Sequence, residues 1–153
     1  MIKAISLWQP WASAMAMGLK KNETRHWATS YRGPLLIHAA KKKIRLPLDL
    51  LRILSQNALN PYKVPYGVLI CKVDLIGCEQ IGYENCPAFD SVEYQLGNYD
   101  HGRWMWVTDN LQTFDPIPYK GSQGFFDVKE INDFGKPQVL YEYPILELSV
   151  WNY

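Results

Sequence analysis

A charge-dense turn follows the first apolar segment of the chain. Lys20, Glu23 and Arg25 stand close together there, directly behind Gly18. If Glu23 and Arg25 lie on a strand, their alternate spacing places the carboxylate and the guanidinium on one face. Lys20, in the preceding turn, can fold over that face. Arg25 would supply planar donors for phosphate or carbonyl oxygens, and Glu23 could take a proton from water. These three residues are therefore the candidate catalytic group.

The same residue types also occur in ordinary surface turns. Ion pairs in such turns typically contribute about 0–1 kcal/mol, and mixed charges there are common. Residue chemistry alone favours a solvated turn, so the surrounding segments must decide.

The segments around this turn predict short strands and helices. Residues 4–8 form a first strand, and Pro10 and Gly18 bound a short helix with Trp11, Ala14 and Met15 on one buried face. The apolar run 35–40 predicts a strand buried on both sides. His38 lies within it and is expected to be a hydrogen-bonded core residue.

Later segments continue this pattern. A second helix begins at Pro47 and ends before 60–61, and 68–76, 103–108 and 145–150 alternate as strands do. One of Trp104 and Trp106 is expected in the core, and the other on a base-stacking surface. Short strands with few helices predict an antiparallel barrel capped by helices. Residues 78–99 are weakly periodic and read as a long loop or variable insert.

Composition limits the class of protein. The chain has 153 residues, 48% of them hydrophobic and 14% aromatic, which predicts a single folded domain over 1–153. The net charge is +1, so any basic surface must be local. Residues 41–45 form the densest basic run, either a solvated strand end or a phosphate-contacting patch. Residues 1–17 lack the pattern of a signal peptide and no stretch resembles a membrane span, so we expect a cytoplasmic protein.

Cys71, Cys78 and Cys86 are the cysteines of the chain. Their odd number and the absence of a Cys-x-x-Cys pair disfavour a disulfide framework, and small buried hydrophobes are their default role. A zinc site that includes His101 is disfavoured by the wide, irregular spacing. No metal site is expected.

The turn and several later segments carry a family resemblance. Gly18-x-Lys20-x-x-Glu23-x-Arg25 resembles the signature of the ASCH (activating signal cointegrator homology) domain, a branch of the PUA-like β-barrels. Residues 6–11, 33–41, 102–106 and 116–124 are also similar to that family, so the likeness covers most of the chain up to about residue 130. It reverses the preference for a solvated turn. It implies a mainly β fold of the α+β class, a PUA-like antiparallel β-barrel with two or three short helices.

The resemblance also implies a cleft that binds RNA or a modified nucleoside. Candidate ligand-binding residues at its rim are Trp8, Gln9, Trp106 and Lys120, because aromatic rings stack on bases, amides read base edges and cations hold phosphates. Lys120 belongs to a glycine-containing loop, 120–124, that allows close ligand approach. No cofactor is expected.

Different functions remain open. Some members of the wider superfamily are amidohydrolases that remove acyl groups from N4-acetylcytidine, and others have been proposed to cleave RNA. This implies a metal-independent hydrolase in which Glu23 activates water, or a ribose 2′-hydroxyl, while Lys20 and Arg25 stabilise the developing charge. In the deacylating branch a threonine nucleophile occupies the place of Glu23, and Thr24 is expected to face the other side of the strand, so that role is not transferred to it.

The alternative is a non-catalytic RNA-binding module that acts in translation or transcription regulation. A third possibility, suggested by the many tyrosines and tryptophans, is a protein-interaction domain with an aromatic patch. Binding by an RNA module would weaken with salt and survive Glu23→Gln, whereas catalysis would not.

Overall fold

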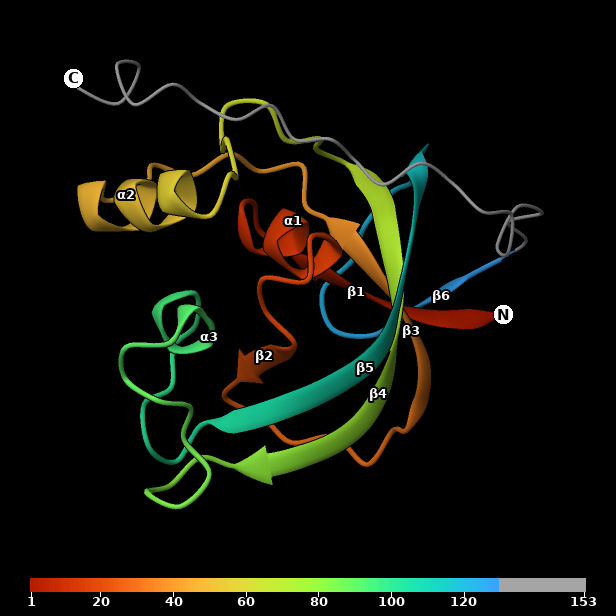
Figure 1. The fold of residues 1–153 in the computed structure, drawn as a ribbon. Helices are drawn as coiled ribbons and strands as arrows, with labels where there is room; N and C mark the ends of the chain where they lie inside the picture. The colour runs from red at the N-terminus through yellow and green to blue at the C-terminus, as the bar shows by residue number, and fades with distance from the viewer. Residues whose placement is uncertain (130–153) are drawn as a thin grey trace.

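The computed structural model describes residues 1–129. Strands dominate this part of the chain, and three short helices interrupt them (Figure 1). The elements are β1 (Ile2–Leu7), α1 (Trp11–Ala16), β2 (Asn22–Arg25), β3 (Gly33–Ala39), α2 (Leu48–Gln56), β4 (Val68–Gln80), α3 (Val92–Gln95), β5 (Trp104–Pro118) and β6 (Phe126–Val128).

The strands form one mixed sheet in the order β2-β5-β4-β3-β1-β6. β1 and β3 run parallel, and the other neighbouring strands are antiparallel. The pairing of β4 with β5 shifts register at three points, and both long strands curve around the molecule (Figure 1). Bulges of this kind bend and twist a sheet. The expected mainly β, α+β fold is confirmed and is consistent with a PUA-like architecture, although across residues 1–129 the sheet is mixed and does not close.

The first helix ends where the glycine predicts. Gly18 has φ +74°, its amide donates to the Met15 carbonyl at 3.0 Å, and the Leu19 amide donates to the Ala14 carbonyl at 2.9 Å. Ala14 and Met15 are buried, as expected, but Trp11 at the helix start is only half-buried. The helix packs against β3 and β4, so its beginning and the turn that follows it are fixed over one face of the sheet.

His38 is a buried, hydrogen-bonded core residue, as predicted. Its Nε2 lies 2.8 Å from the Tyr119 carbonyl and its Nδ1 lies 2.9 Å from Ser6 Oγ. A carbonyl only accepts, so Nε2 carries the proton and Nδ1 accepts from the Ser6 hydroxyl. Burial lowers the pKa of His38, and the hydrogen bond to Tyr119 offsets part of this effect. A Cβ on Gly121 would lie 2.5 Å from the His38 ring, so the 119–125 connection is held close against this pair.

Several expected elements are longer or shorter than the sequence pattern indicates. β4 continues through Gln80 and β5 continues through Pro118, so the connection between them spans 81–103 and contains α3.

Cys71 is buried in the main core, while Cys78 and Cys86 are half-buried. The strand predicted over 145–150 lies outside the described residues.

Candidate functional site

The turn before β2 is held in place by a carboxylate from the β4–β5 connection. Glu93, in α3, accepts hydrogen bonds from the backbone amides of Lys21 at 3.0 Å and Asn22 at 2.6 Å. The hydroxyl of Tyr99 donates to the same carboxylate at 3.1 Å. Bonds to a charged acceptor are stronger than neutral ones. The turn that presents Lys20 is therefore fixed by a segment more than seventy positions away.

Lys20, Glu23 and Arg25 come together as predicted. Lys20 Nζ lies 3.3 Å from Glu23 Oε2, and Arg25 Nε lies 3.5 Å from Glu23 Oε1. Arg25 also donates from an Nη atom to the Ser6 carbonyl at 3.0 Å. The Lys20 side chain is 2% exposed, whereas those of Glu23 and Arg25 are 17% and 24% exposed. One carboxylate therefore sits between two cations, and ligand access is mainly to Glu23 and Arg25.

These residues line a hollow that we call the charged cleft, formed by two adjoining cavities of about 320 and 520 Å³. Ligand-binding pockets commonly have volumes of this order. Trp8, Trp11, Glu23, Thr24 and Arg103 line both cavities. The smaller is completed by Ser6, Leu7, Arg25 and His26, and the larger by Lys20, Pro47, Leu50, Gln95, Gly97 and Asn98.

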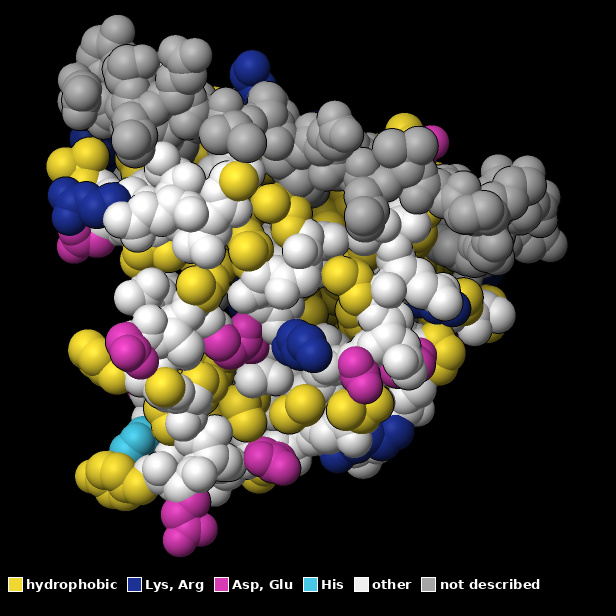
Figure 2. Space-filling model, viewed as in Figure 1, with side chains coloured by type: hydrophobic (Ala, Val, Ile, Leu, Met, Phe, Trp, Pro, Cys, Tyr) yellow, Lys and Arg dark blue, Asp and Glu magenta, His cyan; other side chains and the backbone are white. Residues whose placement is uncertain are grey.

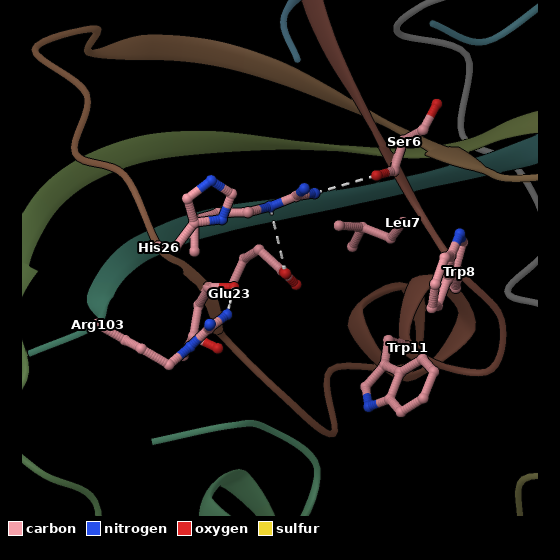
Figure 3. A pocket seen from close by; sticks show the side chains of 9 residues that line it. Ser6, Leu7, Trp8, Trp11, Glu23, His26 and Arg103 are labelled. Atoms are coloured by element: carbon pink, nitrogen blue, oxygen red, sulfur yellow. Dashed lines mark hydrogen bonds and ion pairs between the residues drawn. The ribbon is translucent and has the colours of Figure 1, made fainter. Parts of the chain in front are cut away.

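The cleft has one aromatic side and one charged side (Figure 3). Trp8, directly after β1, and Trp11, at the start of α1, lie together across the pocket from Glu23, His26 and Arg103. Figure 2 shows basic and acidic side chains next to one another over the middle of this face, with hydrophobic side chains around them. The arrangement offers a planar apolar surface beside hydrogen-bonding charges.

Positive charge prevails in the charged cleft. Lys20, Arg25 and Arg103 line it, and among the described residues that line it Glu23 is the one acid. Arg103 donates to the Thr24 carbonyl at 3.1 Å, which ties β2 to the segment just before β5 and places the guanidinium beside Glu23 (Figure 3). An anionic ligand is favoured by this balance, and Glu23 remains available as an acceptor for ligand N–H groups.

The structure does not bring the four predicted rim residues together at the charged cleft. Trp8 is half-exposed and lines both cavities, so its ring is accessible from the charged cleft. Lys120 is exposed but lines neither cavity, and its neighbour Gly121 lies against the Ser6–His38 pair.

The predictions for Gln9 and Trp106 are not supported by their environments. Gln9 is 3% exposed, and its amide is used internally: Nε2 donates to Ser13 Oγ and to the Pro65 carbonyl, and Oε1 accepts from the Ser13 amide. Trp106 is fully buried, and its indole N–H donates to the Trp27 carbonyl at 3.2 Å. Of the two alternating tryptophans Trp106 is thus the core residue. Trp104, on the same side of β5, is half-buried against the same hydrophobic cluster and does not line the charged cleft.

Several cleft residues were not predicted from the sequence. Three of them lie next to residues that the sequence analysis singled out: Trp11, His26 and Arg103. Arg103 also belongs to a segment, 102–106, that is similar to the ASCH family. Gln95 and Asn98 come from the region read as a variable insert. Only the three-dimensional path of 81–103, which brings this region back beside β2, could reveal them.

Comparison with known proteins is consistent with the fold described above. The family model for the ASCH domain matches residues 5–118, which include every element from β1 to β5 except the first few residues of β1. The chain belongs to the ASCH domain family. The ASCH family is associated with RNA binding.

Two curated relatives are similar to this ASCH domain over part of its length. Activating signal cointegrator 1 of Homo sapiens is 39% identical over 82 residues, and that of Mus musculus is 38% identical over 82 residues. Each match covers 48% of this chain and 14% of the relative. This ASCH domain therefore corresponds to a small part of those proteins. None of the helices within residues 1–129 has the length and hydrophobicity of a membrane-spanning segment.

Proposed function

We propose that the charged cleft binds a base of RNA or of a modified nucleoside. The observation that carries this proposal is the placement of the Trp8 and Trp11 rings opposite Glu23 and Arg103. A base can stack on an aromatic side chain while its edge hydrogen-bonds to polar groups. A carboxylate accepts from base amino or imino groups, and a guanidinium donates to base carbonyls or phosphates.

Lys20 and Arg25 have different parts in this proposal. Lys20 is almost inaccessible, so its role is to hold the Glu23 carboxylate in one orientation. Arg25 is more exposed, lines the smaller cavity and is fixed by the Ser6 carbonyl, so it is the cation that meets the ligand. A preoriented acceptor beside a preoriented donor lowers the ordering cost of binding.

Direct binding measurements test the cleft. Trp8→Ala should weaken binding of cytidine, N4-acetylcytidine or a short RNA by roughly 5- to 150-fold, because stacking on an aromatic side chain contributes about 1–3 kcal/mol per base. Isothermal titration calorimetry gives this change for nucleosides and fluorescence anisotropy gives it for RNA. Tyr83→Ala is the matched control, since Tyr83 is 92% exposed and lines neither cavity. Equal affinity in the Trp8 variant and the parent would contradict the proposal.

A second candidate is metal-independent hydrolysis at the same cleft. The observation that favours it is the position of the Arg25 guanidinium, 3.5 Å from Glu23 Oε1, where a cation for a developing oxyanion lies beside the carboxylate. With an N4-acylcytidine, Glu23 takes a proton from water while the water oxygen bonds to the acyl carbon. The carbonyl oxygen becomes an oxyanion beside Arg25, the C–N bond breaks, and the proton passes to the leaving nitrogen. The products are a carboxylic acid and cytidine.

Mass spectrometry separates hydrolysis from binding alone. The parent protein is incubated with N4-acetylcytidine, other N4-modified cytidines and a mixed-sequence RNA, with and without EDTA. Turnover that resists EDTA and is lost in Glu23→Gln, while that variant still binds, supports the hydrolase. Turnover that is equal in Glu23→Gln and parent excludes Glu23 as the base. Salt-sensitive binding without turnover identifies a recognition module instead.

A further inference from the structure

We propose that the natural ligand is a single-stranded RNA whose chain continues from the charged cleft into a second groove, so that the domain reads a polymer rather than a free nucleoside. This inference rests on the proposed function of the charged cleft. It concerns the segment 43–48, the start of α2 and the tyrosines that face them.

The second groove has a volume of about 610 Å³, and we call it the basic groove. Lys43 and Arg45 line it together with Pro47, Tyr62 and Tyr66, and no acidic residue is among its lining residues. Lys41, Lys42, Lys43 and Arg45 are all exposed. The net charge of the whole chain is only +1, so this groove concentrates positive charge locally. A polyanion is the ligand class that such a local excess favours.

Aromatic rings and ammonium groups alternate along this surface. Lys42 Nζ lies 5.3 Å from the centroid of the Trp8 ring, and Lys43 Nζ lies 5.1 Å from the centroid of the Tyr66 ring. A stacked base would replace each ammonium on its ring face, and the displaced ammonium, on a flexible stem, would remain within reach of the adjoining phosphate. Ring and cation in alternation are the components of a groove that binds single strands.

The charged cleft and the basic groove adjoin at Pro47, and residues 8–10 extend from one to the other. Trp8 lines both cavities of the charged cleft, and the next two residues, Gln9 and Pro10, line the basic groove. Pro47 lines both the larger cavity and the basic groove. A strand with one base in the charged cleft therefore has a direct path past Trp8 to Tyr66. A nucleoside fills only the first of these places, and a base-paired duplex keeps its base faces covered by neighbouring base pairs.

The experiment measures how binding affinity depends on ligand length in the parent protein and in variants of the basic groove. Fluorescence anisotropy, or calorimetry for the smallest ligands, measures the affinity for one, two, four and six nucleotides of single-stranded RNA at several salt concentrations. In the parent protein, affinity should rise at least tenfold between one and six nucleotides. The double variant Lys43→Ala/Arg45→Ala, which removes two cations that line the basic groove and not the charged cleft, should lose most of this gain and leave mononucleotide binding unchanged. Its slope of log affinity against log salt should fall by roughly 1.4, about 0.7 for each lost phosphate contact.

A matched control removes a lysine that lies outside the basic groove. Lys3 pairs with Asp127 across β1 and β6, on the opposite side of the molecule from α2, so Lys3→Ala should bind like the parent (Figure 1). Tyr66→Ala should weaken hexanucleotide binding. Tyr66→Phe should bind the hexanucleotide like the parent, because the aromatic stacking face is retained.

Outcomes for the two hollows can be told apart. If mononucleotide binding depends on Trp8 but affinity does not increase with length, or increases equally in the Lys43/Arg45 variant, the inference about the basic groove is overturned and the proposed function stands. Equal affinity for a duplex of the same length also overturns it. If neither nucleotides nor RNA bind in a Trp8-dependent manner, the proposed function itself fails.

Discussion

The ammonium group of Lys20 lies 3.3 Å from the carboxylate of Glu23 at a position where only 2% of the Lys20 side chain is exposed. A buried ammonium needs a partner of opposite charge, because its desolvation is otherwise uncompensated. The family signature is therefore also a structural unit: the residue that presents a carboxylate to the cleft is the residue that neutralises a buried lysine.

Removal of the Glu23 charge should destabilise the fold. Glu23→Gln is expected to lower the free energy of unfolding by about 1–3 kcal/mol, because Lys20 is left buried beside a neutral amide. Lys20→Met in the same background should recover part of the loss, since no unpaired charge then remains. Urea unfolding of both single variants and the double variant measures this coupling. The exposed pair Lys3–Asp127 is the control, and Asp127→Asn should change stability by less than about 1 kcal/mol. Additive effects of the Lys20 and Glu23 changes would show that the pair is not coupled.

Glu93 should support the site from outside the cleft. Glu93→Ala leaves the amides of Lys21 and Asn22 without their acceptor, and we expect a loss of about 1–3 kcal/mol in the free energy of unfolding. Thermal or urea denaturation measures it, with exposed Glu84→Ala as the matched control. Slower amide hydrogen exchange at Lys21 and Asn22 in the parent than in the variant would locate the effect in the turn. Unchanged exchange at both amides would contradict this role for Glu93.

The buried imidazole of His38 should make stability fall as the pH falls. Burial lowers the pKa of His38 in the folded protein below the unfolded value of about 6.5. As the pH falls through that value, the unfolded chain takes up a proton at His38 before the folded protein does, and this favours unfolding. The stabilisation is thus present above pH 6.5 and is lost progressively toward lower pH. The free energy of unfolding, measured between pH 7 and 5.5, should change less steeply in His38→Gln than in the parent. Exposed His101→Gln should retain the steep profile, and a profile equally steep in His38→Gln would exclude this residue as the cause.

The close approach of Gly121 to the Ser6–His38 pair should exclude a side chain. A Cβ at this position would lie 2.5 Å from His38 Cε1 and 2.6 Å from Ser6 Oγ. Gly121→Ala is expected to cost roughly 1–3 kcal/mol, because the connection must shift or the hydrogen bonds of His38 must break. Gly82→Ala is the control, since a Cβ there meets nothing within 4 Å. Thermal unfolding of the two variants measures the difference, and equal midpoints would show that the 119–125 connection yields freely.

Local sequence patterns alone determined which segments form strands and helices near the site. Pro10 and Gly18 delimited α1, and the alternation around Glu23 predicted β2, because backbone preferences and side-chain periodicity act within a few residues. The clustering of Lys20, Glu23 and Arg25 followed from the same short-range geometry. His38 was correctly placed in the core because its neighbours are uniformly apolar.

Tertiary structure decided which side chains reach the cleft. Alternation along β5 shows that Trp104 and Trp106 share a face but not which of them is covered, and packing against Trp27 and the main core buries Trp106. The parallel pairing of β1 with β3 and the return of 81–103 beside β2 depend on contacts between residues far apart in sequence. For that reason Trp8 and Arg103 became cleft residues while Gln9 and Lys120 did not. Periodicity assigns a side chain to a face of its own element, and only the packing of elements against one another decides what that face meets.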